Sequence, residues 1–158
     1  MTAQEVLDRL AEIANQKTAF IGLGNRDRGD DAVGLRFVED LRQLNPNYFF
    51  SEEQGLESII LQIMKDKDVD NVIFVDSCDF GSQPGEIALL KLDSIDETIS
   101  THKIPLSMLM ALIQSEGKKA YLVGIQPESL DFGRDISETI KAILERIEDV
   151  VGIRLRSN

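Results

Sequence analysis

The sequence predicts an α/β protein: one three-layer domain over residues 1–158, with a twisted, mostly parallel sheet of about five strands and helices on both faces. Strand and helix signals alternate along the chain, which is typical of this class. Residues 71–76 form a continuous apolar run, as expected of a strand covered on both faces. A chain of this length buries about 70% of its unfolded surface, so it needs no disulfide or structural metal to fold.

Each expected element has a local signal. Thr2 and Glu5 have the spacing of a capping box, which starts a first helix. Apolar side chains at helical spacing predict further helices, one beginning near Asp30 or Asp31 and another with Pro105 in its first turn. A Pro-Gly pair at 84–85 marks a turn. Strands are expected at 18–23, 48–50, 71–76, 86–92 and 120–125, and the other helices at 56–64 and 140–151.

Composition excludes several functional classes. The net charge of −11 opposes binding to nucleic acid, because phosphates would be repelled over most of the surface. No apolar run is long enough for a membrane span, and the first residues lack the basic start and apolar core of a secretion signal. Cys78 is the single cysteine and cannot form an internal disulfide. We therefore expect a cytoplasmic protein.

Three possible metal ligands follow strand ends. Asp31 comes after the first strand in a glycine-rich turn, Asp76 ends the central strand, and His102, the only histidine, follows the fourth strand. The carboxyl ends of parallel strands meet at one edge of a sheet, where α/β proteins usually place their sites. Two carboxylates and one imidazole suit a divalent ion such as zinc, nickel or manganese with open coordination positions. Such a site polarises a carbonyl or activates water.

Each of these residues also has a structural interpretation. Asp30 is a possible N-cap of its helix, and Asp31 a complement to the helix dipole. Asp76 is a possible cap of the loop that follows it, and His102 an ordinary loop residue. Cys78 is expected to be a buried thiol, since nothing nearby in sequence marks it as an activated nucleophile.

Four better-known site motifs fit poorly. No Gly-x-Ser-x-Gly nucleophile elbow is present. Asp27 takes the place of the third glycine of a dinucleotide fingerprint, and no Gly-Lys-Ser/Thr follows for a phosphate loop. A signalling receiver domain also gathers acids at strand ends around a metal. It needs a lysine closing the last strand, where this chain has Gly-Ile-Gln-Pro-Glu at 124–128.

Short motifs in a fixed order extend over nearly the whole chain, and together they resemble those of the nickel–iron hydrogenase maturation endopeptidases. The segments are Gly-Leu-Gly-Asn at 22–25, Asp-Asp-Ala-Val-Gly at 30–34, Val-Asp-Ser at 75–77, Pro-Gly at 84–85, Ser-Thr-His at 100–102 and Gly-Ile-Gln-Pro-Glu at 124–128. Two segments depart from the family pattern. Residues 26–28 are charged where relatives are partly apolar, and Glu-Gln-Gly-Leu at 53–56 replaces Asp-Gly-Gly-Thr.

The resemblance implies an aspartyl-type endopeptidase that removes the C-terminal extension of a nickel–iron hydrogenase large-subunit precursor after nickel insertion. By motif position, Asp31, Asp76 and His102 bind the metal, which is nickel supplied by the substrate. The purified protein is expected to be metal-free, since an open three-ligand site is weaker than a closed one. Asp30, unoccupied by metal, is a candidate general base for the attacking water.

Two alternatives belong to other classes. One is a non-enzymatic metal-binding or chaperone-like module that binds the same precursor without cutting it. The other is a receiver-like signalling domain phosphorylated on Asp76, which the missing lysine disfavours.

Overall fold

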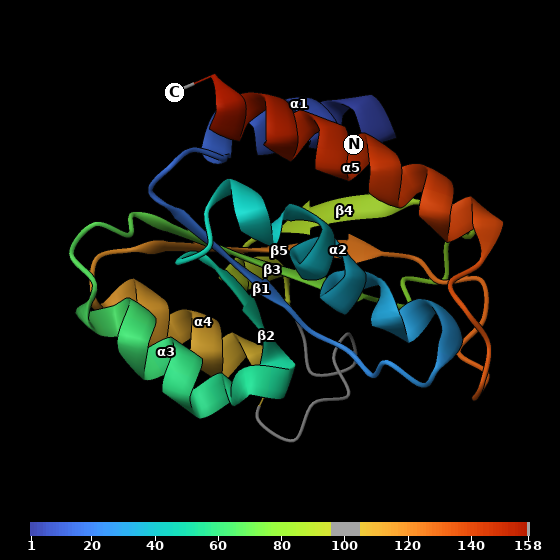
Figure 1. Cartoon of the computed structure of the whole chain (residues 1–158), viewed down its shortest axis with the longest axis horizontal. Helices are drawn as coiled ribbons and strands as arrows, with labels where there is room; N and C mark the ends of the chain where they lie inside the picture. The colour runs from blue at the N-terminus through green and yellow to red at the C-terminus, as the bar shows by residue number, and fades with distance from the viewer. Residues whose placement is uncertain (96–104, 158) are drawn as a thin grey trace.

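The computed structural model describes residues 1–95 and 105–157, and they build one five-stranded sheet (Figure 1). The strands are β1 (Thr18–Gly22), β2 (Phe49–Ser51), β3 (Asn71–Ser77), β4 (Ile87–Leu90) and β5 (Lys119–Ile125). They lie in the order β2-β1-β3-β5-β4, and every neighbouring pair is parallel except β4 with β5. The predicted mostly parallel sheet is confirmed.

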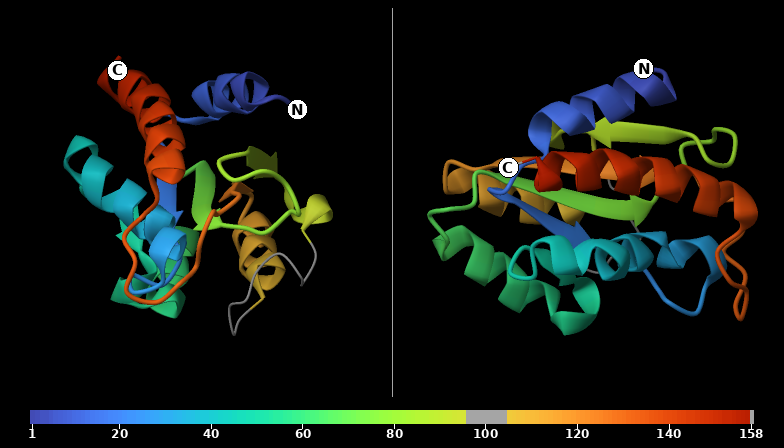
Figure 2. Two further views of the ribbon diagram at one scale, coloured as in Figure 1. Left: turned by 90° about the vertical axis from the view of Figure 1, so that its right-hand side faces the viewer. Right: turned by 45° about the horizontal axis from the view of Figure 1, so that its top comes forward.

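Helices cover both faces of the sheet, as Figures 1 and 2 show. One face carries α1 (Ala3–Ile13), α2 (Val33–Leu41) and α5 (Glu138–Arg156), and the other carries α3 (Leu56–Lys65) and α4 (Leu106–Ser115). Four short 3₁₀ turns complete the elements, η1 (Gly29–Ala32), η2 (Arg42–Leu44), η3 (Glu52–Gln54) and η4 (Leu92–Ser94). In residues 1–95 and 105–157, no helix combines the length and apolar character that crossing a bilayer requires.

The sheet separates two apolar cores because successive side chains of a strand point to opposite faces. On the α1/α2/α5 side, the ring of Phe20 stacks on Phe49 at 4.8 Å and packs against Phe37 at 5.5 Å. On the α3/α4 side, Ile21 and Phe74 lie under the helices, both fully buried. Strands β1 and β3 therefore bury apolar side chains on both faces of the sheet, as the continuous run at 71–76 predicts for β3.

The predicted helix starts are partly confirmed. Thr2 and Glu5 form the expected capping box, with the Glu5 amide donating to Thr2 Oγ1 at 3.1 Å and the Thr2 amide to Glu5 Oε1 at 3.2 Å. Pro105 lies at the N-cap of α4, one residue before the predicted position. Asp30 as an N-cap is wrong, because it lies inside η1, which has no side-chain cap, and α2 begins three residues later.

One acidic pair on the α2/α5 surface gives the fold a pH dependence. The pKa of Glu148 is raised to about 8, first by partial burial and then by a hydrogen bond shared with Asp40. The nearby Asp149 carboxylate raises it further, and Arg36 lowers it. Between pH 4.5 and about 8, Glu148 is thus protonated in the folded protein, whereas the same carboxyl group is ionised in the unfolded chain.

We expect the free energy of unfolding to fall as pH rises from about 4.5 to about 8, because only the unfolded state loses the Glu148 proton in that range. Glu148→Gln removes this titration. The variant should therefore gain roughly 0.5–1 kcal/mol over the parent protein by pH 8.5, a modest amount because the group is half exposed and solvent-screened. Urea unfolding at pH 5, 7 and 8.5 measures the difference, with Glu145→Gln on the exposed face of α5 as the matched control. Equal pH profiles of the parent and Glu148→Gln would contradict the assignment.

Candidate functional site

The carboxyl edge of the sheet brings together the loops after β1 and β3. The two strands are parallel neighbours with Gly22 in register with Val75, and the Leu23 amide donates to the Val75 carbonyl at 2.9 Å. The chain beyond each strand therefore leaves the sheet at the same place. Asp31 lies on the first of these loops, and Asp76 lies at the end of β3.

Asp31 and Asp76 meet around Gly24. Asp31 Oδ1 accepts the hydroxyl of Ser77 at 2.6 Å, and its Oδ2 accepts the Asn25 amide at 3.0 Å. A Cβ atom at Gly24 would lie 3.8 Å from Asp76 Oδ1 and 1.9 Å from the Asp31 carbonyl oxygen. The Asp76 side chain is only 3% exposed. The structure thus places two of the three predicted ligands at one corner of the sheet.

The third predicted ligand, His102, lies outside the described residues. Among the residues that the structure does describe, no three His, Cys, Asp or Glu side chains form a group that could hold a metal. The two aspartates alone supply the oxygen donors of the predicted site.

Glycine is required at two positions for this corner to form. Gly24 has a φ of 137°, in the region that favours glycine, and a side chain there would overlap the Asp31 carbonyl. Gly34 opens α2, where a Cβ would lie 2.1 Å from the Val75 carbonyl oxygen and 2.5 Å from that of Leu23. These contacts explain why the motif at 22–34 is rich in glycine: the start of α2 packs directly on the ends of β1 and β3.

Asp30 is buried and joins two distant loops. It is 1% exposed, and its Oδ2 accepts the amides of Glu128 and Ser129 at 2.8 and 3.0 Å. Its Oδ1 accepts the Ser137 amide at 2.7 Å and the Ser137 hydroxyl at 3.0 Å. The Asp30 amide in turn donates to the Ser129 carbonyl at 2.9 Å. This carboxylate therefore holds the 128–137 loop against the loop that carries Asp31.

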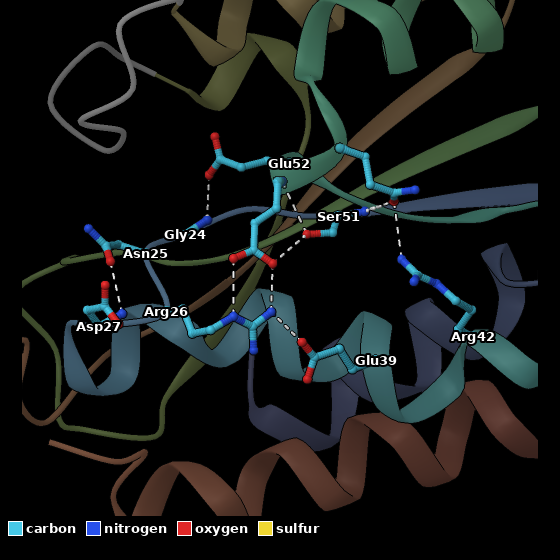
Figure 3. Close-up of polar contacts among 10 residues, drawn as sticks. Gly24, Asn25, Arg26, Asp27, Glu39, Arg42, Ser51 and Glu52 are labelled. Carbon is cyan, nitrogen blue, oxygen red and sulfur yellow. Dashed lines mark hydrogen bonds and ion pairs between the residues drawn. The ribbon is translucent and has the colours of Figure 1, made fainter. Parts of the chain in front are cut away.

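A charged cluster lies beside residues 23–29, here called the glycine loop, which follow β1 (Figure 3). Arg26 donates to Glu53 through Nε at 3.1 Å and Nη2 at 2.6 Å, and it also donates to Glu39. These contacts lower the pKa of Glu53 and raise that of Arg26. Next to them, Glu52 Oε1 accepts the Gly24 amide at 2.6 Å. The loop after β2 is thus tied to the glycine loop at two points.

The polar residues after β5 form hydrogen bonds with neighbouring loops and with α5. Gln126 Oε1 accepts the Phe80 amide at 2.6 Å, and Gln126 Nε2 donates to Asp79 at 3.1 Å. Gln126 therefore holds the loop that connects β3 to β4. Glu128, the last residue of the 124–128 segment, accepts the hydroxyl of Thr139 at 3.4 Å.

Cys78 is a buried thiol, as predicted. It is 2% exposed, and its pKa is raised first by burial and then by the charges of Asp76 and Asp31. A thiol in such an environment stays protonated and is a poor nucleophile.

A polar cleft of about 370 Å³ opens beside Asp31. It is lined by residues 24–28 together with Asp31, Glu52 and Glu53. Carboxylates and guanidinium groups share this surface, so its side chains offer both acceptors and donors to a ligand. Of the two aspartates, Asp31 lines this cleft.

Comparisons with known proteins agree with this geometry. A family model described as hydrogenase maturation protease matches residues 55–153. The crystal structure of the [NiFe] hydrogenase maturation protease HycI from Thermococcus kodakarensis superposes with a TM-score of 0.80 at 32% identity, covering 96% of this chain and 99% of that one.

Two curated relatives have similar names. The hydrogenase 3 maturation protease of Escherichia coli is 27% identical over 129 residues, covering 79% of this chain and 82% of that protein. The hydrogenase expression/formation protein HoxM of Azotobacter vinelandii is 30% identical over 140 residues, covering 80% of this chain and 66% of that protein. These likenesses decide against the receiver-like and non-enzymatic alternatives. The chain belongs to the hydrogenase maturation protease family, and it is accordingly a hydrolase of the peptidase class.

Proposed function

We propose that this protein is the endopeptidase that removes the C-terminal extension of a nickel–iron hydrogenase large-subunit precursor after nickel insertion. Membership of the maturation protease family supports the reaction class. The observation that carries the proposal is the convergence of Asp31 and Asp76 around Gly24, beside a cleft that can hold a peptide.

The nickel in the precursor is the recognition element in this proposal. Two carboxylates in one corner repel each other, and burial of Asp76 strengthens that repulsion because the surroundings screen it poorly. A divalent cation brought by the substrate would offset both costs. Each Asp31 oxygen accepts one hydrogen bond and keeps a further lone pair for a metal. We assign His102 as the nitrogen ligand, which completes a set that suits nickel.

Metal contact at this corner would position the scissile bond for attack by water. Placing the reactants correctly supplies roughly 7–11 kcal/mol of a barrier. Cys78 is unsuited to nucleophilic attack because its pKa is raised. The aspartates are then the groups that direct hydrolysis, which makes this an aspartyl-type endopeptidase.

We assign Asp30 a positioning role in place of the general-base role suggested by the sequence. A general base has to reach the water whose proton it takes. Asp30 is 1% exposed, and both of its oxygens already accept hydrogen bonds from the 128–137 loop. Its carboxylate therefore acts on the site by fixing the loop that carries Asp31.

We expect Asp76→Asn and His102→Ala each to slow processing of a nickel-loaded precursor by at least about 100-fold, because each removes one ligand of the substrate's metal. The measurement is the mobility shift of the precursor on a denaturing gel over time. Asp68→Asn, on the exposed turn before β3 and so at the other end of that strand from Asp76, is the matched control and should process normally. A nickel-free precursor should remain uncut by the parent protein. Normal processing by both site variants would refute the proposed metal recognition.

We expect Asp30→Ala to lower the free energy of unfolding by about 1–3 kcal/mol, because it leaves part-buried donors of the 128–137 loop without their acceptor. Asp27→Asn, a change to an exposed neighbouring carboxylate, should cost less than about 0.5 kcal/mol. Urea unfolding measures both.

If Asp30 positions the loop, Asp30→Asn should retain part of the activity with an unchanged pH profile. Loss of the acidic limb of that profile in a fully folded variant would favour the general-base role.

A further inference from the structure

We propose that Arg28, steadied by Phe132, forms a subsite for a carboxylate of the precursor's C-terminal extension. This inference rests on the proposed function, since it assigns a specificity role within the same cleft. The carboxylate belongs either to an acidic side chain of the extension or to its terminal carboxyl group. Both present the same pair of oxygens to a guanidinium, and the experiment below separates them.

Arg28 has donor capacity that the described residues leave unused. Its guanidinium has no carboxylate within ion-pair distance in residues 1–95 and 105–157, and its buried Nε donates to no acceptor there. Other arginines near this edge are paired: Arg26 with Glu39 and Glu53, and Arg134 with Asp131. A guanidinium carries five N–H donors in a planar fork, so Arg28 retains the geometry for a two-pronged contact.

The position of Arg28 places this donor beside the candidate catalytic corner. Arg28 and Asp31 line the same cleft and are three residues apart in the chain. An extended peptide advances about 3.3–3.6 Å per residue. A peptide that brings its scissile bond to Asp31 would therefore present a residue of the extension to Arg28 within a few positions of the cut.

Phe132 holds the guanidinium in place. Arg28 Cζ lies 5.9 Å from the centre of the Phe132 ring, within the range of a cation–π interaction. Phe132 is 74% exposed, so its ring remains accessible to a ligand. Its loop is nevertheless fixed, because the Gly133 amide donates to the Asp27 carbonyl at 2.9 Å and the Asp30 carboxylate binds the loop's two ends. An exposed aromatic ring on a fixed loop is well suited to cover a bound peptide.

The cleft lining carries four carboxylates and two guanidinium groups, and of these two only Arg26 is ion-paired among the described residues. Arg26 pairs with Glu53, Glu52 accepts the Gly24 amide, and Asp31 accepts the hydroxyl of Ser77. Arg28 is thus a local positive charge without a counter-ion among the described side chains of a protein whose net charge is −11. A carboxylate on the substrate would provide that counter-ion, and such charge-assisted pairs are the strong hydrogen bonds of proteins.

The test compares processing kinetics of a nickel-loaded precursor by the parent protein, Arg28→Met, Arg28→Lys and Phe132→Leu. We expect Arg28→Met to raise KM about tenfold or more with little change in kcat, since the contact serves binding. Arg28→Lys should recover part of the loss, because an ammonium keeps the charge without the planar fork. Phe132→Leu should raise KM about two- to threefold. Arg134→Met, on the same loop but paired with Asp131, is the matched control and should match the parent protein.

Two altered precursors identify the carboxylate. In one, the acidic side chains of the extension are changed to amides, and in the other the extension ends in a carboxamide. The precursor that lacks the recognised carboxylate should show the raised KM with the parent protein and no further rise with Arg28→Met. If the parent protein cuts the precursor and Arg28→Met leaves KM unchanged, or if neither altered precursor changes KM, the subsite is refuted while the proposed function stands. If the folded parent protein cuts no nickel-loaded precursor, the proposed function itself fails, and the subsite fails with it.

Discussion

The buried carboxylate of Asp30 is the interaction on which the carboxyl edge of the sheet depends. It accepts hydrogen bonds from residues 98 to 107 positions away, and so it joins the loop after β1 to the loop after β5. Burying a charge is costly unless it is fully hydrogen-bonded, and here three backbone amides and a hydroxyl satisfy it. The position of Asp31 is fixed as a consequence, because the neighbouring residue in the chain cannot move.

Close backbone packing then determines how near the two candidate ligands lie. Gly34 lets the first turn of α2 rest on the carbonyls of Leu23 and Val75, and Gly24 lets the Asp31 backbone fold over the end of β1. The resulting corner brings two carboxylates close together. Among the described residues, no group of three metal-ligating side chains forms there. In the proposed function, a cation delivered by the substrate would offset the charge of these carboxylates. Dependence on that cation would also prevent cleavage of a precursor that has not yet received it.

The features predicted from sequence are those with local causes. The apolar run at 71–76 is a central strand, the Thr2–Glu5 pair caps α1, and Asp31 and Asp76 lie at the same sheet edge. The contacts of Asp30 could not be predicted, because its partners are about a hundred residues away, and the sequence suggested an N-cap or a general base instead. The antiparallel direction of β4 was likewise not predicted, since alternating strand and helix signals do not show which strand reverses.

The two departures from the family pattern turn out to be in contact. Arg26 belongs to the charged stretch of the glycine loop, and Glu53 belongs to the altered segment after β2, yet the two side chains form a two-pronged ion pair. This pair ties the two loops to each other, and Arg26 pairs with Glu39 of α2 as well. Residues 26–28 contribute to the cleft lining both the paired guanidinium of Arg26 and that of Arg28, which has no ion pair among the described residues. In the proposed function, substrate preference would then reside in residues 26–28, beside the aspartates that carry the family motifs.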